Sequence, residues 1–234
     1  ATFAATVAVG FLFNPHGAAV FWTDAVRDPS RVGSAFFAGN QALTGVLPRW
    51  AGEPLPHAVV LVAQALAGLA ALVAASYLHR RGRELESVIA ASFGMLAMSP
   101  ISWSHHWVWA WPAALVLVAA LVRQLRGARG GNGDHAAADV DHGDARGIGA
   151  AERAPGWAVA TGALLMVWLL VFVSRSTWWP PHYEDAELSW SLVQKVLGNT
   201  YVVAGALWIA WALLDARAGR RGRNVASLAP RGGE

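Results

Sequence analysis

The chain has 234 residues, of which 55% are hydrophobic and only 14% are charged, with 18 basic against 15 acidic residues and no cysteine. A soluble domain carries about 25% charged residues, so the composition excludes an ordinary soluble domain, and the lack of cysteine excludes disulfides and thiolate metal sites. Because the apolar residues form long blocks without the period-two alternation of β-barrel strands, we predict an all-α fold, a polytopic transmembrane helical bundle.

The N-terminal part holds one partial and one complete membrane span. Ala1–Phe13 is apolar but too short to cross a bilayer, which takes about 20 helical residues, so we interpret it as the end of a truncated first span in a longer protein. Asn14–Pro56 is polar and rich in proline and glycine, and we expect an outer loop there with short helices near Pro15–Arg27 and Ala38–Arg49. His57–Leu78 is the clearest span.

A helical hairpin is predicted over Ser87–Val122. Its middle, SPISWSHHWVWAW at 99–111, places His105 and His106 among four tryptophans. The hairpin is slightly short for two full crossings, so we expect its turn near the membrane surface or just beneath it. An ionisable pair at that depth is costly and indicates a functional site. The alternative is that the two histidines anchor the turn at the interface beside the tryptophans.

The C-terminal part combines a polar linker with two more spans. Residues 127–155 are rich in Gly, Ala, Asp and His and lack an apolar face, so we expect a flexible cytoplasmic linker. Its carboxylates and imidazoles allow a metal site, but a flexible segment does not hold ligand geometry, and a solvated loop is the interpretation we favour. Membrane helices are thus expected at 1–126 and at 156–214, the latter around an outer segment at 174–195. A disordered basic tail is expected at 215–234.

The basic residues predict the orientation of this bundle. Most of the 18 lysines and arginines follow alternate spans, in groups that begin at Arg80, Arg123 and Arg217. Arginine-rich connections stay in the cytoplasm, so the loop at 14–56, the histidine turn and the segment at 174–195 face outward. About five spans and a truncated first one result.

The three outward segments collect side chains that suit a sugar or a phosphate. Aromatic faces with amide and carboxylate acceptors fit a sugar ring, whereas an arginine or a protonated histidine fits a phosphate. A cavity open to lipid would admit a substrate with a long isoprenoid tail. Besides the two histidines, these segments offer Asp24, Asn40, Gln41, Arg49, His182, Tyr183, Glu184 and Asp185. For Asp24 and for His182–Asp185, the interpretation we favour is that of solvated polar groups of a loop.

Two stretches resemble a known family. The run SPISWSHHWVW, preceded by GNQALTGVL at Gly39–Leu47 and by Arg49, resembles the C-terminal half of the actinobacterial glycosyltransferase family 87. The resemblance implies a partial C-type glycosyltransferase fold and a multi-pass enzyme that uses polyprenyl-phosphate mannose as its donor. It also implies transfer of a hexose, expected to be mannose, to a lipid-linked or cell-envelope glycan acceptor at the outer face of the plasma membrane. Membrane lipids are expected partners, and we expect no cofactor, no metal ion and no nucleic acid.

The same resemblance implies an inverting displacement, in which a base deprotonates the acceptor hydroxyl and polyprenyl phosphate leaves. The presumed catalytic aspartate of the family lies in its N-terminal half and has no counterpart here. We therefore assign no base and expect this chain alone to be inactive. His105 or His106 is the candidate that stabilises the leaving phosphate. Since neighbouring residues point about 100° apart on a helix, we expect only one of the two to face the cavity.

Six further residues are candidate substrate-binding groups. Asn40 and Gln41 belong to the resembling motif, although Ala42 stands where the family usually has serine. Their alternative role is helix capping and loop hydrogen bonding. Arg49 either binds a phosphate or sits at the lipid headgroups. The six candidates are Trp103, Ser104, Trp107, Asn40, Gln41 and Arg49.

Two other function classes remain open at the level of sequence. A transporter or flippase requires charged or broken helices near the midplane and internal repeats, whereas the predicted spans are almost uncharged at their centres. A non-catalytic membrane scaffold is compatible with the missing base. An outer-loop aspartate upstream of Ala1 would favour the enzyme.

Overall fold

A computed structural model describes residues 2–27, 31, 33–137 and 153–227. Over these residues the chain is almost entirely helical and contains no β-strand, only an isolated bridge between Asn40 and Trp103, which confirms the all-α class. In chain order the helices are α1 (Thr2–Phe13), α2 (Pro15–Thr23), η1 (Ala25–Arg27), α3 (Leu43–Ala51), α4 (His57–His79), α5 (Glu84–Met98), η3 (Ser104–Trp109), α6 (Ala110–Ala137), α8 (Arg153–Ser174), η4 (Ser176–Trp178), η5 (Ala186–Ser189), α9 (Leu192–Gly198) and α10 (Thr200–Ser227).

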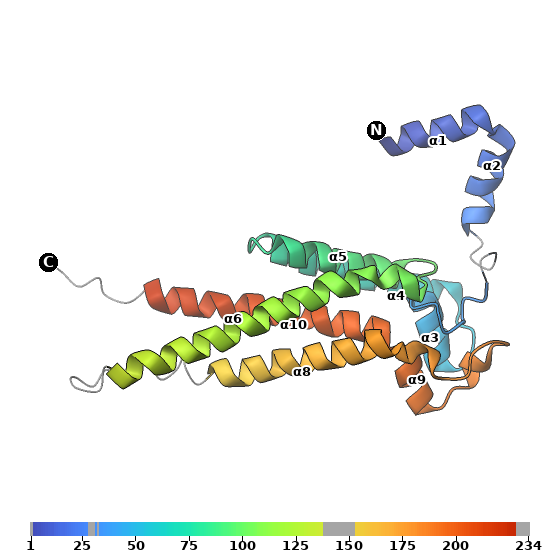
Figure 1. The fold of residues 1–234 in the computed structure, drawn as a ribbon. Coiled ribbons are helices and arrows are strands. Elements are labelled where there is room, and N and C mark those ends of the chain that lie inside the picture. Colours follow the sequence, from blue (N-terminus) through green and yellow to red (C-terminus); the bar gives the residue numbers. More distant parts are fainter. Residues whose placement is uncertain (1, 28–30, 32, 138–152, 228–234) are drawn as a thin grey trace.

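Five long helices, α4, α5, α6, α8 and α10, run along a common direction (Figure 1). The short helices α3 and α9 lie at one end of this bundle, and α1 and α2 project away from it. Four helical segments of the described chain are long and apolar enough to cross a membrane: His57–His79, Ser104–Gly127, Gly156–Ser174 and Thr200–Ala218. The chain is therefore a polytopic helical membrane protein, as predicted.

One predicted span is shorter than a bilayer requires. α5 has 15 residues, which gives about 22 Å of helix against about 30 Å of hydrocarbon. It ends at Met98 because Pro100 forces Ser99 into an extended conformation, with φ −59° and ψ 148°. The side chain of Gln64 in α4 donates to the carbonyls of Met98 and Ser99 at 2.7 and 3.1 Å, which satisfies groups that the helix leaves unpaired.

Buried tryptophans hold the long helices together. The indole nitrogens of Trp168 in α8 and Trp208 in α10 donate to the α6 carbonyls of Ala110 and Ala113, at 3.0 and 3.1 Å. Phe93 of α5 packs between these indoles, with ring centroids 5.7 Å from each. Each ring thus buries a large apolar area while its polar atom is satisfied, which fixes four helices around one aromatic core.

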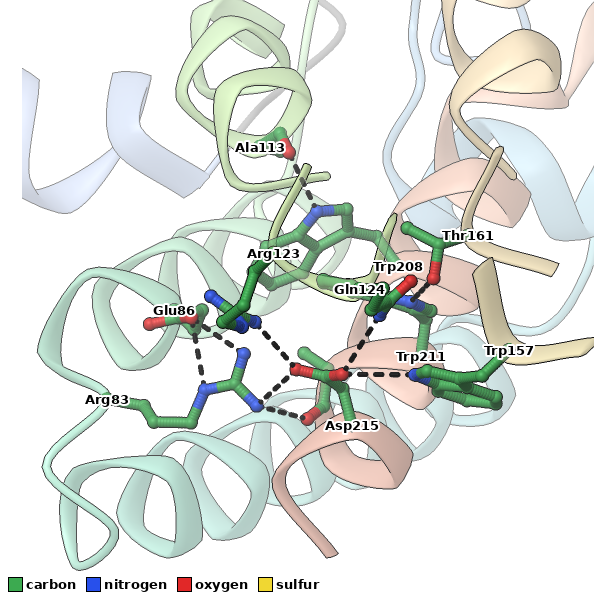
Figure 2. A network of polar contacts seen from close by, with 11 residues as sticks. Arg83, Glu86, Ala113, Arg123, Gln124, Trp157, Thr161, Trp208, Trp211 and Asp215 are labelled. Atoms are coloured by element: carbon green, nitrogen blue, oxygen red, sulfur yellow. Dashed lines mark hydrogen bonds and ion pairs between the residues drawn. The ribbon is translucent and has the colours of Figure 1, made fainter. Parts of the chain in front are cut away.

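Asp215 of α10 ties the helices together at the end of the bundle far from α3 and α9. Figure 2 shows its carboxylate paired with Arg83 at 3.0 Å and Arg123 at 3.5 Å, and accepting from the Trp157 indole at 3.0 Å. Arg83 also pairs with Glu86 at 2.7 Å. Because these residues come from the α4–α5 connection and from α5, α6, α8 and α10, the network fixes the relative positions of five segments.

The helices extend beyond the spans that hydropathy predicts. α6 continues to Ala137 and α8 begins at Arg153, so the ends of the expected linker at 127–155 are helical. α10 likewise continues to Ser227, into the expected tail at 215–234. The remainder of both expectations, at 138–152 and 228–234, lies outside the described residues.

Candidate active site

The three segments expected to face outward line one pocket of about 570 Å³ at the α3 and α9 end of the bundle. The first loop contributes Ser34 and Phe37, and the histidine turn contributes Trp103, Ser104 and His105. The third wall comes from the connection between α8 and α9, with Trp178, Tyr183, Glu184, Asp185 and Glu187. Residues that are far apart in the sequence, from Gly33 to Glu187, thus line one pocket.

Aromatic rings form much of the pocket wall, with Phe37 at their centre. Its ring centroid lies 6.0 Å from that of Trp103, 5.5 Å from Trp178 and 5.4 Å from Tyr183. The imidazole of His182 lies 6.1 Å from the same ring and 5.5 Å from Trp178. Tyr183 is the most open of these rings, at 64% exposure. Ring faces are therefore available to a ligand from the first loop, the histidine turn and the third wall.

The third wall is acidic. Glu187 is only 1% exposed, and its Oε1 accepts from the backbone N–H of Ala38 at 2.9 Å. Asp185 accepts from the hydroxyl of Ser34 at 2.9 Å, whereas no hydrogen bond or ion pair joins Glu184 to the rest of the described chain. No lysine or arginine is among the described residues that line the pocket, so its walls carry net negative charge.

The acidic wall has an unusual backbone. Three consecutive residues, Tyr183, Glu184 and Asp185, have φ values of 90°, 54° and 57°. Left-handed conformations in residues other than glycine cost of order 1–3 kcal/mol each and persist only where surrounding contacts impose them. The contacts of Asp185 and Glu187 with the first loop supply that constraint, so this turn is held in one shape on the pocket wall.

Only one of the two candidate histidines lines the pocket. His105 is on the wall, while the Nδ1 atom of His106 accepts from the backbone N–H of Trp103 at 3.2 Å and so caps η3. The imidazoles touch each other with centroids 4.4 Å apart. His105 is therefore the imidazole that lines the pocket.

Asn40 joins the first loop to the histidine turn rather than facing the pocket. It is fully buried, and its Oδ1 accepts from the N–H groups of Ser102 and Ala42 at 3.0 and 3.1 Å. The N–H of Gln41 donates to the Ser102 carbonyl at 2.7 Å, and its amide donates to the carbonyl of Gly198 at 2.8 Å. Asn40 and Gln41 therefore connect the first loop to the histidine turn and to the end of α9, which fixes the relative positions of these segments.

Arg49 lies beneath the pocket and is 0% exposed. Its Nη1 donates to the carbonyls of Phe36 and Phe37 at 3.1 and 3.0 Å, and its Nη2 to the carbonyl of Asn40 at 2.8 Å. Nε and Nη2 both donate to Oδ1 of Asn199, at 2.9 and 2.7 Å. These bonds use all five donors of the guanidinium, which leaves none for a phosphate or a lipid headgroup.

Burial has an electrostatic consequence for Arg49. Removal from water lowers its pKa to about 9, well below the usual value of an arginine, and the nearby carboxylate of Glu187 opposes this shift. Arg49 therefore stays cationic at neutral pH, and its charge is balanced by a carboxylate that itself belongs to the pocket wall.

Two further sequence candidates lie away from the pocket. Trp107 is 3% exposed and stacks on Phe93 with centroids 5.7 Å apart, so it belongs to the aromatic core. Asp24 follows α2, outside the pocket lining, where it pairs with Arg31. Trp103 and Ser104 are the substrate-binding candidates that do line the pocket.

Sequence reasoning missed Phe37, Trp178, Glu187 and Asn199. The only signal for Glu187 and Asn199 is a carboxylate and an amide close to apolar spans, which does not reveal that they meet a loop about 150 positions away. No group of three or more potential metal ligands occurs within the described part of the chain.

Comparison with known proteins confirms the resemblance that the motifs indicate. Residues 1–102 match the sequence profile of Glycosyltransferase family 87. The chain is 31% identical over 212 residues to a polyprenol-phosphate-mannose-dependent alpha-(1-2)-phosphatidylinositol pentamannoside mannosyltransferase of Mycobacterium tuberculosis, covering 89% of this chain and 41% of that protein. It is 28% identical to the protein of the same description from Mycolicibacterium smegmatis, covering 90% of this chain and 44% of that protein.

A third relative aligns with a shorter region. It is a polyprenol-phosphate-mannose-dependent alpha-(1-2)-phosphatidylinositol mannoside mannosyltransferase of Mycobacterium tuberculosis, 34% identical over 118 residues, which cover 50% of this chain and 28% of the relative. The chain thus spans less than half the length of these curated relatives. No solved structure matches it significantly.

Proposed function

We propose that this chain forms part of a membrane mannosyltransferase that takes mannose from polyprenyl-phosphate mannose and adds it to a glycolipid acceptor. The observation that carries the proposal is the meeting of three distant segments around one pocket that bears His105, aromatic faces and carboxylates. The mycobacterial relatives, whose names include both a polyprenol-phosphate-mannose donor and a phosphatidylinositol mannoside, support the substrate classes.

The pocket is proposed to open at the outer face of the plasma membrane. The C-terminal ends of α6 and α10 lie at the opposite end of the bundle (Figure 1), and Arg83 and Arg123 pair there with Asp215 of α10, in the half of the bundle away from α3 and α9. Basic connections of membrane proteins remain in the cytoplasm, so the pocket end then lies on the extracytoplasmic side, where a lipid-linked donor and a glycolipid acceptor both have access to it.

The proposed reaction is an inverting displacement at the anomeric carbon of the mannose. A base takes the proton of the acceptor hydroxyl, whose oxygen forms the new bond to that carbon. The bond between the carbon and the phosphate oxygen breaks, and polyprenyl phosphate leaves with the electron pair. We assign the base to a group outside this chain.

His105 is proposed to act on the phosphate side of this reaction. An imidazole on the pocket wall donates a hydrogen bond to the leaving phosphate as its charge grows, which stabilises the transition state more than the ground state. Trp103 and Ser104 next to it are proposed substrate contacts. Asn40, Gln41 and Arg49 are proposed as positioning residues, because the Asn40 amide, the Gln41 side-chain nitrogen and the Arg49 guanidinium are bonded within the protein.

The test replaces each histidine in the intact natural protein, supplied in membranes with labelled polyprenyl-phosphate mannose and a phosphatidylinositol mannoside acceptor. We expect His105→Ala to lower the transfer rate by about 10²–10³, the usual effect of losing one transition-state hydrogen-bond donor. His106→Ala should retain much more activity, since His106 caps η3 instead of lining the pocket.

His57→Ala is the matched control, because His57 is exposed and begins α4 outside the pocket. It should leave the rate unchanged. Full activity in His105→Ala would remove His105 from the reaction, and failure of the unaltered protein to transfer mannose to any mannoside would overturn the proposed function.

A further inference from the structure

The acidic wall and the histidine turn offer different chemistry to a substrate. Glu184, Asp185 and Glu187 come from the connection between α8 and α9, whereas His105 comes from the histidine turn. A phosphate is repelled by carboxylates and needs a cation or a hydrogen-bond donor. The buried guanidinium of Arg49 does not serve, because every one of its donors is already used. The acidic wall is thus unsuited to the phosphate of the donor lipid.

The same wall is suited to a neutral, hydroxyl-rich ring. Ionised carboxylates only accept hydrogen bonds, and sugar hydroxyls donate them. Glu184 is exposed and has no partner among the described residues, and Asp185 uses one oxygen on Ser34. The rings of Trp178, Tyr183 and Phe37 line the same pocket as these carboxylates and supply apolar faces on which the C–H side of a sugar can lie.

The shape of the wall is fixed before a ligand arrives. Glu187 bonds to the backbone of Ala38, and Asp185 to Ser34, so the turn at 183–185 is attached to the first loop. The pocket volume of about 570 Å³ falls within the range of about 300–1,000 Å³ that small-molecule sites occupy. A preformed wall avoids the entropy cost of ordering a loop on binding.

We propose that the wall formed by Phe37, Trp178, Tyr183, Glu184 and Asp185 is the subsite for a neutral mannose ring of the acceptor glycan, with the donor phosphate on the His105 side. This inference rests on the proposed function for the identity of the acceptor. It assigns acceptor selectivity to the connection between α8 and α9, and it makes Glu184 and Asp185 specificity-determining residues rather than catalytic ones.

The kinetic test uses Glu184→Ala, Asp185→Asn and Tyr183→Ala in the intact natural protein. Asp185→Asn retains an oxygen that can accept from Ser34, so the turn keeps its attachment. Each variant should raise the KM for a phosphatidylinositol mannoside acceptor about tenfold, while the KM for polyprenyl-phosphate mannose stays within about twofold. Glu53→Ala, an exposed carboxylate outside the pocket, is the control and should change neither constant.

A binding measurement separates this inference from the proposed function. α-1,2-Mannobiose, which has neither phosphate nor lipid, is titrated into the detergent-solubilised protein and followed by tryptophan fluorescence and saturation-transfer NMR. We expect saturable binding that weakens about tenfold in Glu184→Ala, whether or not the preparation transfers mannose. Equal binding in the variant and the unaltered protein, or a raised KM for the donor alone, would overturn the subsite. Loss of transfer with mannobiose binding intact would count only against the proposed function.

Discussion

Arg49 shows how a single residue can be recognised from sequence while its role is not. An arginine that follows an Asn-Gln pair within the same outer segment suggests a phosphate ligand, since guanidinium groups commonly bind phosphate. Its actual acceptors are the backbone of the first loop and Asn199, which is 150 positions away. No local pattern contains that pairing, so the sequence identifies the importance of this region but not the burial that decides its function.

Arg49 should therefore determine stability before it affects catalysis. Arg49→Met leaves the Asn199 side-chain oxygen and three carbonyls without their guanidinium donors and removes the cation near the buried carboxylate of Glu187, and we expect a loss of about 3–5 kcal/mol in the free energy of unfolding. Arg49→Lys keeps the charge but offers three donors instead of five, and should cost about 2 kcal/mol. Thermal unfolding of the detergent-solubilised protein, followed by tryptophan fluorescence, measures both.

A double-mutant cycle tests whether Glu187 is the counter-charge of Arg49. Adding Glu187→Gln to Arg49→Met removes the uncompensated anion, so the double variant should recover about 1–2 kcal/mol relative to the sum of the single changes. Strict additivity would show that the two side chains do not interact and that the loss comes from the hydrogen bonds alone.

At the scale of helices, hydropathy predicts where spans occur better than where they end. The apolar blocks His57–Leu78 and Gly156–Val173 coincide closely with α4 and α8. The ends do not follow hydropathy: Pro100 terminates α5, and α6 continues past its apolar part to Ala137 although that part is rich in glycine. The short α5 is consequently positioned by its contact with α4.

That contact depends on a glycine. A Cβ added at Gly94 of α5 would lie 2.2 Å from the Cβ of Ala71 in α4, so the two helices approach too closely for any side chain. Gly94→Ala should force them apart and lower the stability by about 1–3 kcal/mol, despite the better helix propensity of alanine. The midpoint of thermal unfolding in detergent measures this change.

Gly162→Ala is the corresponding control in α8. A Cβ there meets only Leu121 at 3.9 Å, an ordinary contact, so the midpoint should stay equal or rise. Similar midpoints for the Gly94 and Gly162 variants would contradict the close packing of α4 on α5.

The whole molecule has two chemically different ends. One end gathers aromatic and acidic side chains around the pocket, and the other gathers arginines around Asp215 (Figures 1 and 2). Counting lysines and arginines along the sequence predicts this division, because the rule concerns only which connections carry charge. The pocket itself is harder to predict. The sequence indicates the three segments that form its walls, but not which of their residues line it, because that depends on the contacts of the buried amides Asn40 and Gln41.

The Asp215 network should make the basic end contribute to the stability of the entire bundle. Arg83 and Asp215 are mostly buried, with side-chain exposures of 16% and 12%, so loss of the carboxylate charge is poorly compensated by water. Asp215→Asn keeps an acceptor for Trp157 but removes the charge that Arg83 and Arg123 share, and we expect a loss of about 2 kcal/mol in the free energy of unfolding.

Glu84→Gln provides the comparison, because the pair of Glu84 with His79 lies at the same end but is exposed, at 66% and 67%. Such exposed pairs contribute at most about 1 kcal/mol, and at high salt even less. Thermal unfolding at low and at high salt should therefore show a large, salt-insensitive loss for Asp215→Asn and a small loss for Glu84→Gln that salt removes. If Asp215→Asn unfolds at the same temperature as the unaltered protein, the five segments that meet at Asp215 are held by their apolar contacts alone.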